Sequence, residues 1–424
     1  MAKNISYEAA IASVLEQVEA GGVRTLPLHE VTGEILGVDV VAGCDVPPFP
    51  RATMDGYAVR WTGSETEGAY GVVGTIVPGQ GWEGSPGDRG CVRIMTGAAV
   101  PPAFDTVIPV EDSVSRVAGE VNFTAAARRG DNIARQGEDA RRGELLIPRG
   151  SLLRTRHVPT LAAEGLWDVP VYERPSVAVI ATGGELREPW EDAPPPCIHN
   201  TNAPFLMASL RSAGFTGARY LGIVADESEP LLEKIRAGLE SDFLLITGGV
   251  SMGDGDLVPD CLTACGVRKI LHKVSMKPGK PLFVGRSERG SMVVGFPGNP
   301  VAVMVHFSMF VQPLLLKATG AREHLPKPVL LPLAQEASNR SGRKKFSLGR
   351  IVSRAGRSFV QELVSQGSGD FISARLAEGV FEIPLGVSRI PAGESVRFYP
   401  AWGDFFGETG APETVGDSGD GPDA

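Results

Sequence analysis

The sequence predicts a multidomain α/β protein with four parts: a central doubly wound α/β domain, an N-terminal helical and extended domain, a β-rich domain inserted into that N-terminal domain, and a C-terminal β-barrel. Residues 243–247 form a continuous apolar run of strand length, typical of a strand buried on both faces of a parallel sheet. Between residue 175 and about residue 320, strand-like and helix-like segments alternate, which predicts the doubly wound domain. Short β-type runs separated by glycine and proline flank this stretch and indicate smaller β-rich units.

Composition is that of an ordinary soluble protein, with 42% hydrophobic and 21% charged residues in a chain of 424. The net charge of −9 disfavours broad binding to nucleic acid or to anionic membranes, so we expect neither partner. Residues 301–316 are the most apolar long segment, but they include polar side chains and a proline, which favours a buried helix over a membrane span.

The N-terminus and the cysteines predict a cytoplasmic location. The first residues lack the apolar core of a signal peptide. The five cysteines are scattered without a CxxC pair, so we expect reduced thiols and no disulfide framework. The six dispersed histidines form no zinc-binding pattern.

Changes in pattern along the chain suggest the domain boundaries. Residues 7–20 carry apolar side chains at helical spacing, and we expect residues 142–173 to return and pack against this helix. The stretch from 325 to 403 predicts a small β-barrel or sandwich, and the acidic tail after Trp402 is expected to be disordered. The expected units are 1–44 with 137–174, 45–136, 175–324, 325–404 and the tail 405–424.

Two chemistries compete for the loop that follows residues 243–247. Gly249 to Gly253 matches the G-x-S-x-G pattern of a serine hydrolase, with Ser251 as nucleophile and His272 or His306 as base. However, the glycine-rich residues 253–256 are a poor start for the helix that must follow such a serine. Carboxylates on a flexible glycine loop are better suited to holding Mg²⁺ against a phosphate, and a solvated acidic turn is the third alternative.

Acidic residues follow three strand-like segments of the predicted parallel sheet. Glu185, Asp226 and Asp256 each come shortly after such a segment. Because the carboxyl ends of parallel strands meet at one edge, we expect these three side chains to converge there.

Cationic and helix-start features accompany this edge. Lys277 and Lys280 lie three residues apart in a proline-rich loop and could present two cations to an oxyanion. Asn299 and Pro300 have the pattern of a helix N-cap and first turn, where free N–H groups can bind an anion. In isolation, each of these features could equally be a solvated loop or simple capping.

Seven motifs occur in an order that resembles a known family: MDGYA at 54–58, RIMTGA at 93–98, GED at 137–139, ATGGEL at 181–186, GGVSMGDGD at 248–256, KPGKP at 277–281 and PGNP at 297–300. The chain resembles the molybdopterin molybdenumtransferases, which include the E domain of gephyrin, over about residues 5–403. The resemblance implies an elongated homodimer in which the central domain binds molybdopterin. It also implies that Asp55 and Thr96 of one subunit face the acidic crevice of the other.

The resemblance further implies a reaction in which adenylylated molybdopterin is hydrolysed while molybdate enters its dithiolene, giving molybdenum cofactor and AMP. Since the substrate supplies both sulfur ligands, the protein needs no cysteine or histidine to bind molybdenum. The implied partners are a molybdopterin adenylyltransferase and molybdoenzyme-maturation proteins. A scaffold that keeps the fold without turnover, as in gephyrin's second role, is the alternative from another class.

Site roles follow from the motifs. The resemblance assigns Mg²⁺ to Glu185, Asp226 and Asp256, and molybdate or substrate phosphate to Lys277 and Lys280. The remaining expected contacts to the substrate are Gly248, Gly249, Ser251, Pro297, Gly298, Asn299, Asn202, Asp139, Ser368 and Arg343. One departure is visible, because the family usually has aspartate where this chain has Gly184, which leaves Glu185 as the carboxylate of that motif.

Overall fold

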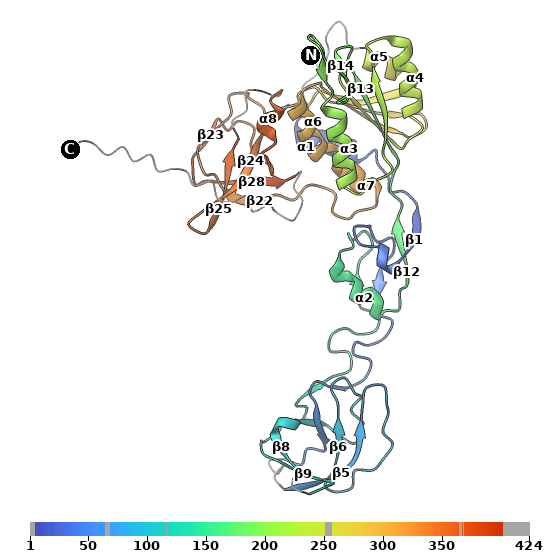
Figure 1. Ribbon diagram of the computed structural model, residues 1–424, viewed down its shortest axis with the longest axis vertical. Helices are drawn as coiled ribbons and strands as arrows, with labels where there is room; N and C mark the ends of the chain where they lie inside the picture. The colour runs from blue at the N-terminus through green and yellow to red at the C-terminus, as the bar shows by residue number, and fades with distance from the viewer. Residues whose placement is uncertain are drawn as a thin grey trace, which may run out of the picture.

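The computed structural model describes residues 5–63, 68–115, 117–250, 257–363, 367 and 369–401. The molecule is elongated (Figure 1). The α/β domain lies at one end with the C-terminal β-unit beside it, and the β-rich unit lies at the other end. A narrow connector joins them and contains β1 (Val23–Pro27), β12 (Asp168–Tyr172) and α2 (Val158–Ala163).

The central sheet of the α/β domain orders its strands β16-β13-β17-β21-β20-β18. Their bounds are β13 (Val177–Thr182), β16 (Arg219–Val224), β17 (Phe243–Thr247), β18 (Val267–His272), β20 (Phe283–Ser287) and β21 (Met292–Phe296). β13 pairs in parallel with β16 on one side and with β17 on the other, whereas β20 is antiparallel to both of its neighbours. The chain therefore reverses its direction of travel across the sheet between β13 and β17, and this is the place where open α/β sheets bind ligands.

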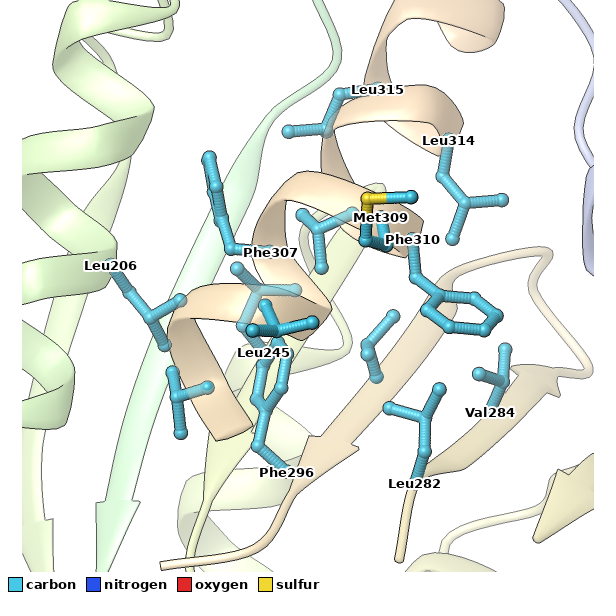
Figure 2. Packing of buried hydrophobic residues seen from close by; sticks show 14 of the residues in the cluster. Leu206, Leu245, Leu282, Val284, Phe296, Phe307, Met309, Phe310, Leu314 and Leu315 are labelled. Atoms are coloured by element: carbon cyan, nitrogen blue, oxygen red, sulfur yellow. The ribbon is translucent and has the colours of Figure 1, made fainter. Parts of the chain in front are cut away.

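Helices cover both faces of this sheet, because side chains of a buried strand alternate between two cores. Leu245 packs with α3 (Asn202–Ser212) and with the helical stretch α6 (Pro300–His306), η4 (Phe307–Val311) and α7 (Gln312–Ala318), as Figure 2 shows. Leu244 and Ile246 face the other way, towards α4 (Ser228–Gly238) and α5 (Val258–Ala264). Every residue of β17 is buried, as its continuous apolar run predicted.

The stretch Pro300–Ala318 is long and apolar enough to cross a membrane by length and composition, and 78% of its most apolar window is buried inside the protein. Leu314 and Leu315 pack in the α/β core with Phe310 (Figure 2). The helix is thus a core element, in agreement with the sequence prediction of a buried helix.

The N-terminal helix α1 (Tyr7–Leu15) packs against the α/β domain. Its Tyr7 hydroxyl donates to the carbonyl of Met309 at 3.3 Å, and the Tyr7 ring meets Phe310 edge-on with centroids 5.4 Å apart. The prediction that residues 142–173 pack against this helix is therefore wrong. The short helix α2 (Val158–Ala163) instead buries Leu161 in a separate connector core, because its six residues suffice only to cover the small sheet there.

Successive antiparallel pairs of short strands build the connector. β1 (Val23–Pro27) pairs with β12 (Asp168–Tyr172), β2 (Val40–Val41) with β11 (Leu145–Ile147), and β3 (Arg51–Ala52) with β10 (Ile133–Ala134). The chain thus runs out along one side of the connector and back along the other. The β-rich unit is an insertion between β3 and β10.

The inserted unit is one mixed sheet, ordered β7-β4-β6-β5-β9-β8. Its strands are β4 (Gly56–Val59), β5 (Ala69–Ile76), β6 (Gly90–Ile94), β7 (Thr106–Pro109), β8 (Ser113–Val114) and β9 (Glu120–Phe123). Cores form on both faces of this sheet, with Val92 on one face and Cys91 on the other.

The C-terminal unit contains β22 (Val329–Pro332), β24 (Lys344–Arg354), β25 (Arg357–Glu362), β26 (Gly379–Ile383) and β28 (Ser395–Pro400). A parallel bridge between Leu333 and Val360 brings the chain after β22 back to β25, so the sheet curls towards closure. Its edge strand β19 (Met276–Lys277) comes from the α/β domain and pairs with β24. This pairing ties the C-terminal unit to the lysine-bearing loop. The predicted tail 405–424 lies outside the described residues.

Replacing Ile11 by alanine tests the placement of α1. Ile11 is buried in the α/β core, so we expect Ile11→Ala to lower the free energy of unfolding of that domain by about 3 kcal/mol. Native-state hydrogen exchange should then be faster for the amides of α7 and β18 and unchanged for those of α2. The exposed-face change Ala12→Ser is the matched control. Faster exchange at α2 in place of α7 would contradict this packing.

Candidate active site

A cavity of about 760 Å³ opens at the switch point of the central sheet. Its walls come from the ends of β13 and β17, the start of α3, the start of α6, and Gly369 and Phe371 of the C-terminal unit. A volume of this size is typical of small-molecule and cofactor sites. The sequence prediction that a ligand site would form beyond these strands therefore coincides with an observed cavity.

Glycines after β17 allow the strand ends to approach each other. Gly248 has φ +95° and Gly249 has φ +62°, both in the left-handed region that favours glycine. A Cβ at residue 248 would overlap the carbonyl of Thr182, at the end of β13. A larger residue here would force the two strand ends apart, so glycine is required by conformation and by space.

Asn202 fastens three walls of the cavity together. Its amide nitrogen donates to the hydroxyl of Thr247 at 2.9 Å and to the carbonyl of Gly298 at 2.8 Å. Because a carbonyl can only accept, these bonds fix which end of the amide is nitrogen. The Asn202 Oδ1 atom is then buried and makes no hydrogen bond to any residue that the structure describes.

Two of the three predicted carboxylates line the cavity. Glu185 follows β13 and Asp226 follows β16, and these strands are neighbours in the sheet. The Glu185 carboxylate lies over Gly183, with Oε2 only 2.7 Å from the position that a Cβ there would occupy. Asp256 lies outside the described residues. Within the described part of the chain, no group of three or more His, Cys, Asp or Glu side chains is arranged to hold a metal ion.

Gly184, the departure from the family motif, is exposed in open space. A Cβ added there would have no atom within 4 Å, and its φ is not in the left-handed range that disfavours larger residues. Neither space nor backbone conformation therefore requires glycine at this position.

The PGNP motif lies between β21 and α6. Pro297, Gly298 and Asn299 line the cavity, and Asn299 occupies the N-cap position with Pro300 in the first turn. The Asn299 side chain makes no capping hydrogen bond. The helix therefore begins at the cavity, as the sequence predicted, although the capping bond expected for the asparagine side chain is not formed. Pro300 has no N–H, and the N–H groups of Ala302 and Val303 donate to the Asn299 carbonyl, so Val301 is the donor that the first turn leaves for a ligand.

The lysine loop, defined as residues 275–281, forms a second polar feature. Lys277 and Lys280 are exposed and do not line the cavity. The Arg343 guanidinium donates to the carbonyl of Met276 at 3.1 Å, so this arginine of the C-terminal unit lies against the loop. Ser368, also expected to contribute from that unit, lies outside the described residues, but its neighbour Gly369 lines the cavity.

Asp55 and Thr96 meet in the inserted β-rich unit. The Thr96 N–H and hydroxyl both donate to Asp55 Oδ1 at 2.7 Å. Both bonds hold the pKa of Asp55 below its ordinary value, and the bond from the backbone N–H has the larger effect. Asp139 lies in the connector, 3.9 Å from Arg51. The inserted unit is at the opposite end of the molecule from β13 (Figure 1), so one chain does not bring these residues to its own cavity.

Each of the two histidines proposed as hydrolase bases is hydrogen-bonded to a backbone carbonyl. His272 Nε2 lies 2.9 Å from the carbonyl of Val250, and His306 Nε2 lies 2.8 Å from the carbonyl of Gly279. Full burial lowers the pKa of His306 to about 4. Helix α5 begins at Val258, and Ser251 lies outside the described residues. This arrangement does not favour the hydrolase alternative.

Sequence reasoning missed one wall of the cavity. The short parallel pair β14 (Leu186–Arg187) and β15 (Ile198–His199) carries a segment from which Ala193 and Cys197 line the cavity. The Tyr220 hydroxyl anchors this segment by donating to Glu188 at 2.7 Å. The three consecutive prolines at 194–196 are the sequence feature that could have predicted an ordered segment lining the cavity here.

The fold and the cavity define a multidomain α/β protein with a ligand site at the switch point of its parallel sheet. Three family models match successive parts of the chain: the MoeA N-terminal region (domain I and II) at residues 5–165, a probable molybdopterin binding domain at 178–317, and the MoeA C-terminal region (domain IV) at 331–401.

Relatives match over most of the chain. A molybdopterin molybdenumtransferase of Synechococcus elongatus is 33% identical over 370 residues, which cover 82% of this chain and 88% of the relative. That of Haemophilus influenzae is 30% identical over 401 residues, covering 93% and 98%. The crystal structure of the molybdopterin biosynthesis moeA protein from Pyrococcus horikoshii OT3 is 28% identical, with a TM-score of 0.79 over 94% of this chain and 100% of that one.

The chain belongs to the molybdopterin molybdenumtransferase family, a family of enzymes. The resemblance and the multidomain α/β class predicted from the sequence are thereby confirmed.

Replacing Thr96 by valine tests the cause of the Asp55 pKa shift. Thr96→Val removes the hydroxyl donor and keeps the backbone N–H, so the pKa of Asp55 should rise part of the way towards its ordinary value. Carboxyl ¹³C NMR titration measures this change. An unchanged Asp55 titration would show that the hydroxyl contributes nothing. Thr124→Val, a change at an exposed position that follows β9 in the same unit, is the control.

Proposed function

We propose that this protein inserts molybdate into the dithiolene of adenylylated molybdopterin and releases AMP in a Mg²⁺-dependent reaction. The observation that carries this proposal is the pair of carboxylates, Glu185 and Asp226, on neighbouring strand ends of one cavity. Family membership supports the same reaction class, since the relatives are named molybdopterin molybdenumtransferases.

The donor set of the cavity fits magnesium. Carboxylate oxygens are the protein ligands that Mg²⁺ prefers, and it retains waters and phosphate oxygens as its other ligands, so few side chains are needed. Glu185 and Asp226 would hold the ion with Asp256 of the adjacent loop. When bound, Mg²⁺ would neutralise charge on the phosphate oxygens of the substrate.

Other groups of the cavity would bind and orient the substrate. The glycine backbone at 248–249 leaves room for a close approach, and the N–H of Val301 at the start of α6 would donate to an anion. The buried Oδ1 of Asn202 can accept a hydrogen bond from the substrate, because its amide nitrogen is already engaged. The dithiolene supplies the soft sulfur ligands for molybdenum, so the protein needs only to position the two substrates.

The lysine loop would hold the oxyanion. Lys277 and Lys280 are exposed, and Arg343 is fixed beside them by its bond to Met276. Three cations on one short loop and its neighbour suit a tetrahedral dianion such as molybdate.

A homodimer would complete the site. Asp55 and Thr96 are far from the cavity of their own chain (Figure 1), and the Thr96 hydrogen bonds stabilise the ionised form of Asp55, whose pKa they lower. We propose that these residues, with Asp139 in the connector, serve the cavity of a second copy. In the cytoplasm, a molybdopterin adenylyltransferase would supply the substrate, and molybdoenzyme-maturation proteins would receive the product.

The test of this function is AMP release from adenylylated molybdopterin by purified protein. We expect release to require molybdate and Mg²⁺ and to stop on addition of EDTA. Glu185→Gln, Asp226→Asn and Asp256→Asn should each lower the rate by at least about tenfold, because each removes a proposed ligand. Asp192→Asn, an exposed residue that does not line the cavity, is the matched control. Tight substrate binding with no release under any of these conditions would indicate a scaffold.

Restoring aspartate at residue 184 tests the metal assignment. Because a side chain there has open space beside Glu185, Gly184→Asp should fold normally and lower the half-saturating Mg²⁺ concentration several-fold, on the order of 1 kcal/mol in binding. Gly184→Ala, which adds a side chain without a charge, is the control. A higher Mg²⁺ requirement in Gly184→Asp would place the metal elsewhere.

A further inference from the structure

We infer that His306 is a positioning residue that holds the lysine loop in register with the cavity. His306 lies in the last turn of α6, the helix that begins at the PGNP motif. Its Nε2 donates to the carbonyl of Gly279, which stands between Lys277 and Lys280. This inference rests on the proposed role of that loop in binding the oxyanion.

The hydrogen bond fixes the protonation state of the imidazole. A carbonyl only accepts, so Nε2 must carry the proton. Nδ1 is buried and has no hydrogen-bond partner among the described residues, and burial lowers the pKa of the ring to about 4, so the ring is neutral. A neutral His306 therefore donates one hydrogen bond, and that bond goes to the lysine loop.

Core packing alone does not account for a histidine here. The ring is fully buried, with the rings of Phe296 and Phe310 each centred 6.1 Å away. In such surroundings an aliphatic side chain would pack without leaving a polar atom unpaired, whereas a buried unpaired acceptor costs about 1–3 kcal/mol. The bond to Gly279 is what the histidine adds to this position.

The loop is shaped to receive this side chain. Gly279 has φ +84°, and a Cβ there would overlap His306 Nε2. The loop therefore lies so close to the imidazole that residue 279 must be glycine. On its other side, β19 pairs with β24, with Lys277 opposite Lys345. The loop is thus clamped between α6 and the C-terminal unit.

The consequence is a rigid link between two parts of the proposed site. His306 follows Pro300 by six residues, about 9 Å along one helix. Pro300 at the start of the helix lines the cavity, and His306 in its last turn bonds to the lysine loop. One helix and one hydrogen bond therefore restrict movement of the two lysines relative to the cavity. Loss of that bond should loosen the loop and weaken oxyanion binding more than it slows the chemical step.

The experiment compares three variants by AMP-release kinetics and by hydrogen exchange of the loop amides. His306→Leu should raise the half-saturating molybdate concentration by about three- to tenfold, the value of one hydrogen bond, with kcat changed less. It should also speed exchange at Met276 and Gly279. His306→Gln, which keeps an N–H donor, should restore both properties. Ser308→Ala removes a buried hydroxyl that bonds only within the same helix and should change neither.

A double-mutant cycle covers the case in which His306→Leu fails to fold. Gly279→Ala should be less harmful in a His306→Ala background than in the original chain, because the overlap with the imidazole is gone. Wild-type exchange and molybdate affinity in His306→Leu, or full additivity in the cycle, would overturn the inference. If the unaltered protein releases no AMP, the proposed function fails, while loop exchange in the same variants still decides the role of His306.

Discussion

The parallel pairing of β13 with β17 is the constraint on which the rest of the site depends. This register sets Ala181 opposite Thr247, so both chains leave the sheet at one edge. The Thr182 carbonyl then occupies the space beside residue 248, which only glycine leaves free. Once these strands end together, the pairing of β16 with β13 adds Asp226 to the same edge, and the bonds of Asn202 to Thr247 and Gly298 close the cavity.

A second link joins this cavity to the C-terminal unit. The helical stretch from Pro300 to Ala318 begins at the cavity and continues into the core that receives α1. The lysine loop lies between this stretch and β24, and Lys344 of β24 pairs with Glu8 of α1 at 2.5 Å. The loop, the N-terminal helix and the C-terminal unit therefore share one junction. A change in the position of the C-terminal unit would move the lysines together with Gly369 and Phe371.

Local pattern predicted the elements well and their long-range partners less well. β17 was predictable because a strand buried on both faces leaves a continuous apolar run, and convergence of Glu185 and Asp226 followed from the geometry of parallel sheets. The segment that packs against α1 was mispredicted, because helical periodicity shows that one face of a helix is buried but does not show which segment covers that face. The contribution of Phe371 depends on the packing of its short helix, α8 (Phe371–Ala374), against α6, and such a contact between distant segments leaves no local pattern in the sequence.

In the proposed reaction, two dithiolene sulfurs of the substrate replace oxygen ligands of molybdate, which leave as water, and the other oxygen ligands stay on molybdenum. X-ray absorption at the molybdenum edge measures this directly, because oxygen and sulfur neighbours scatter at different distances. After incubation of the protein with adenylylated molybdopterin, molybdate and Mg²⁺, we expect two sulfur neighbours on molybdenum in the isolated pterin product. Molybdenum surrounded by oxygen alone, with AMP nevertheless released, would show a hydrolase that does not transfer the metal, and the proposed reaction would then be wrong.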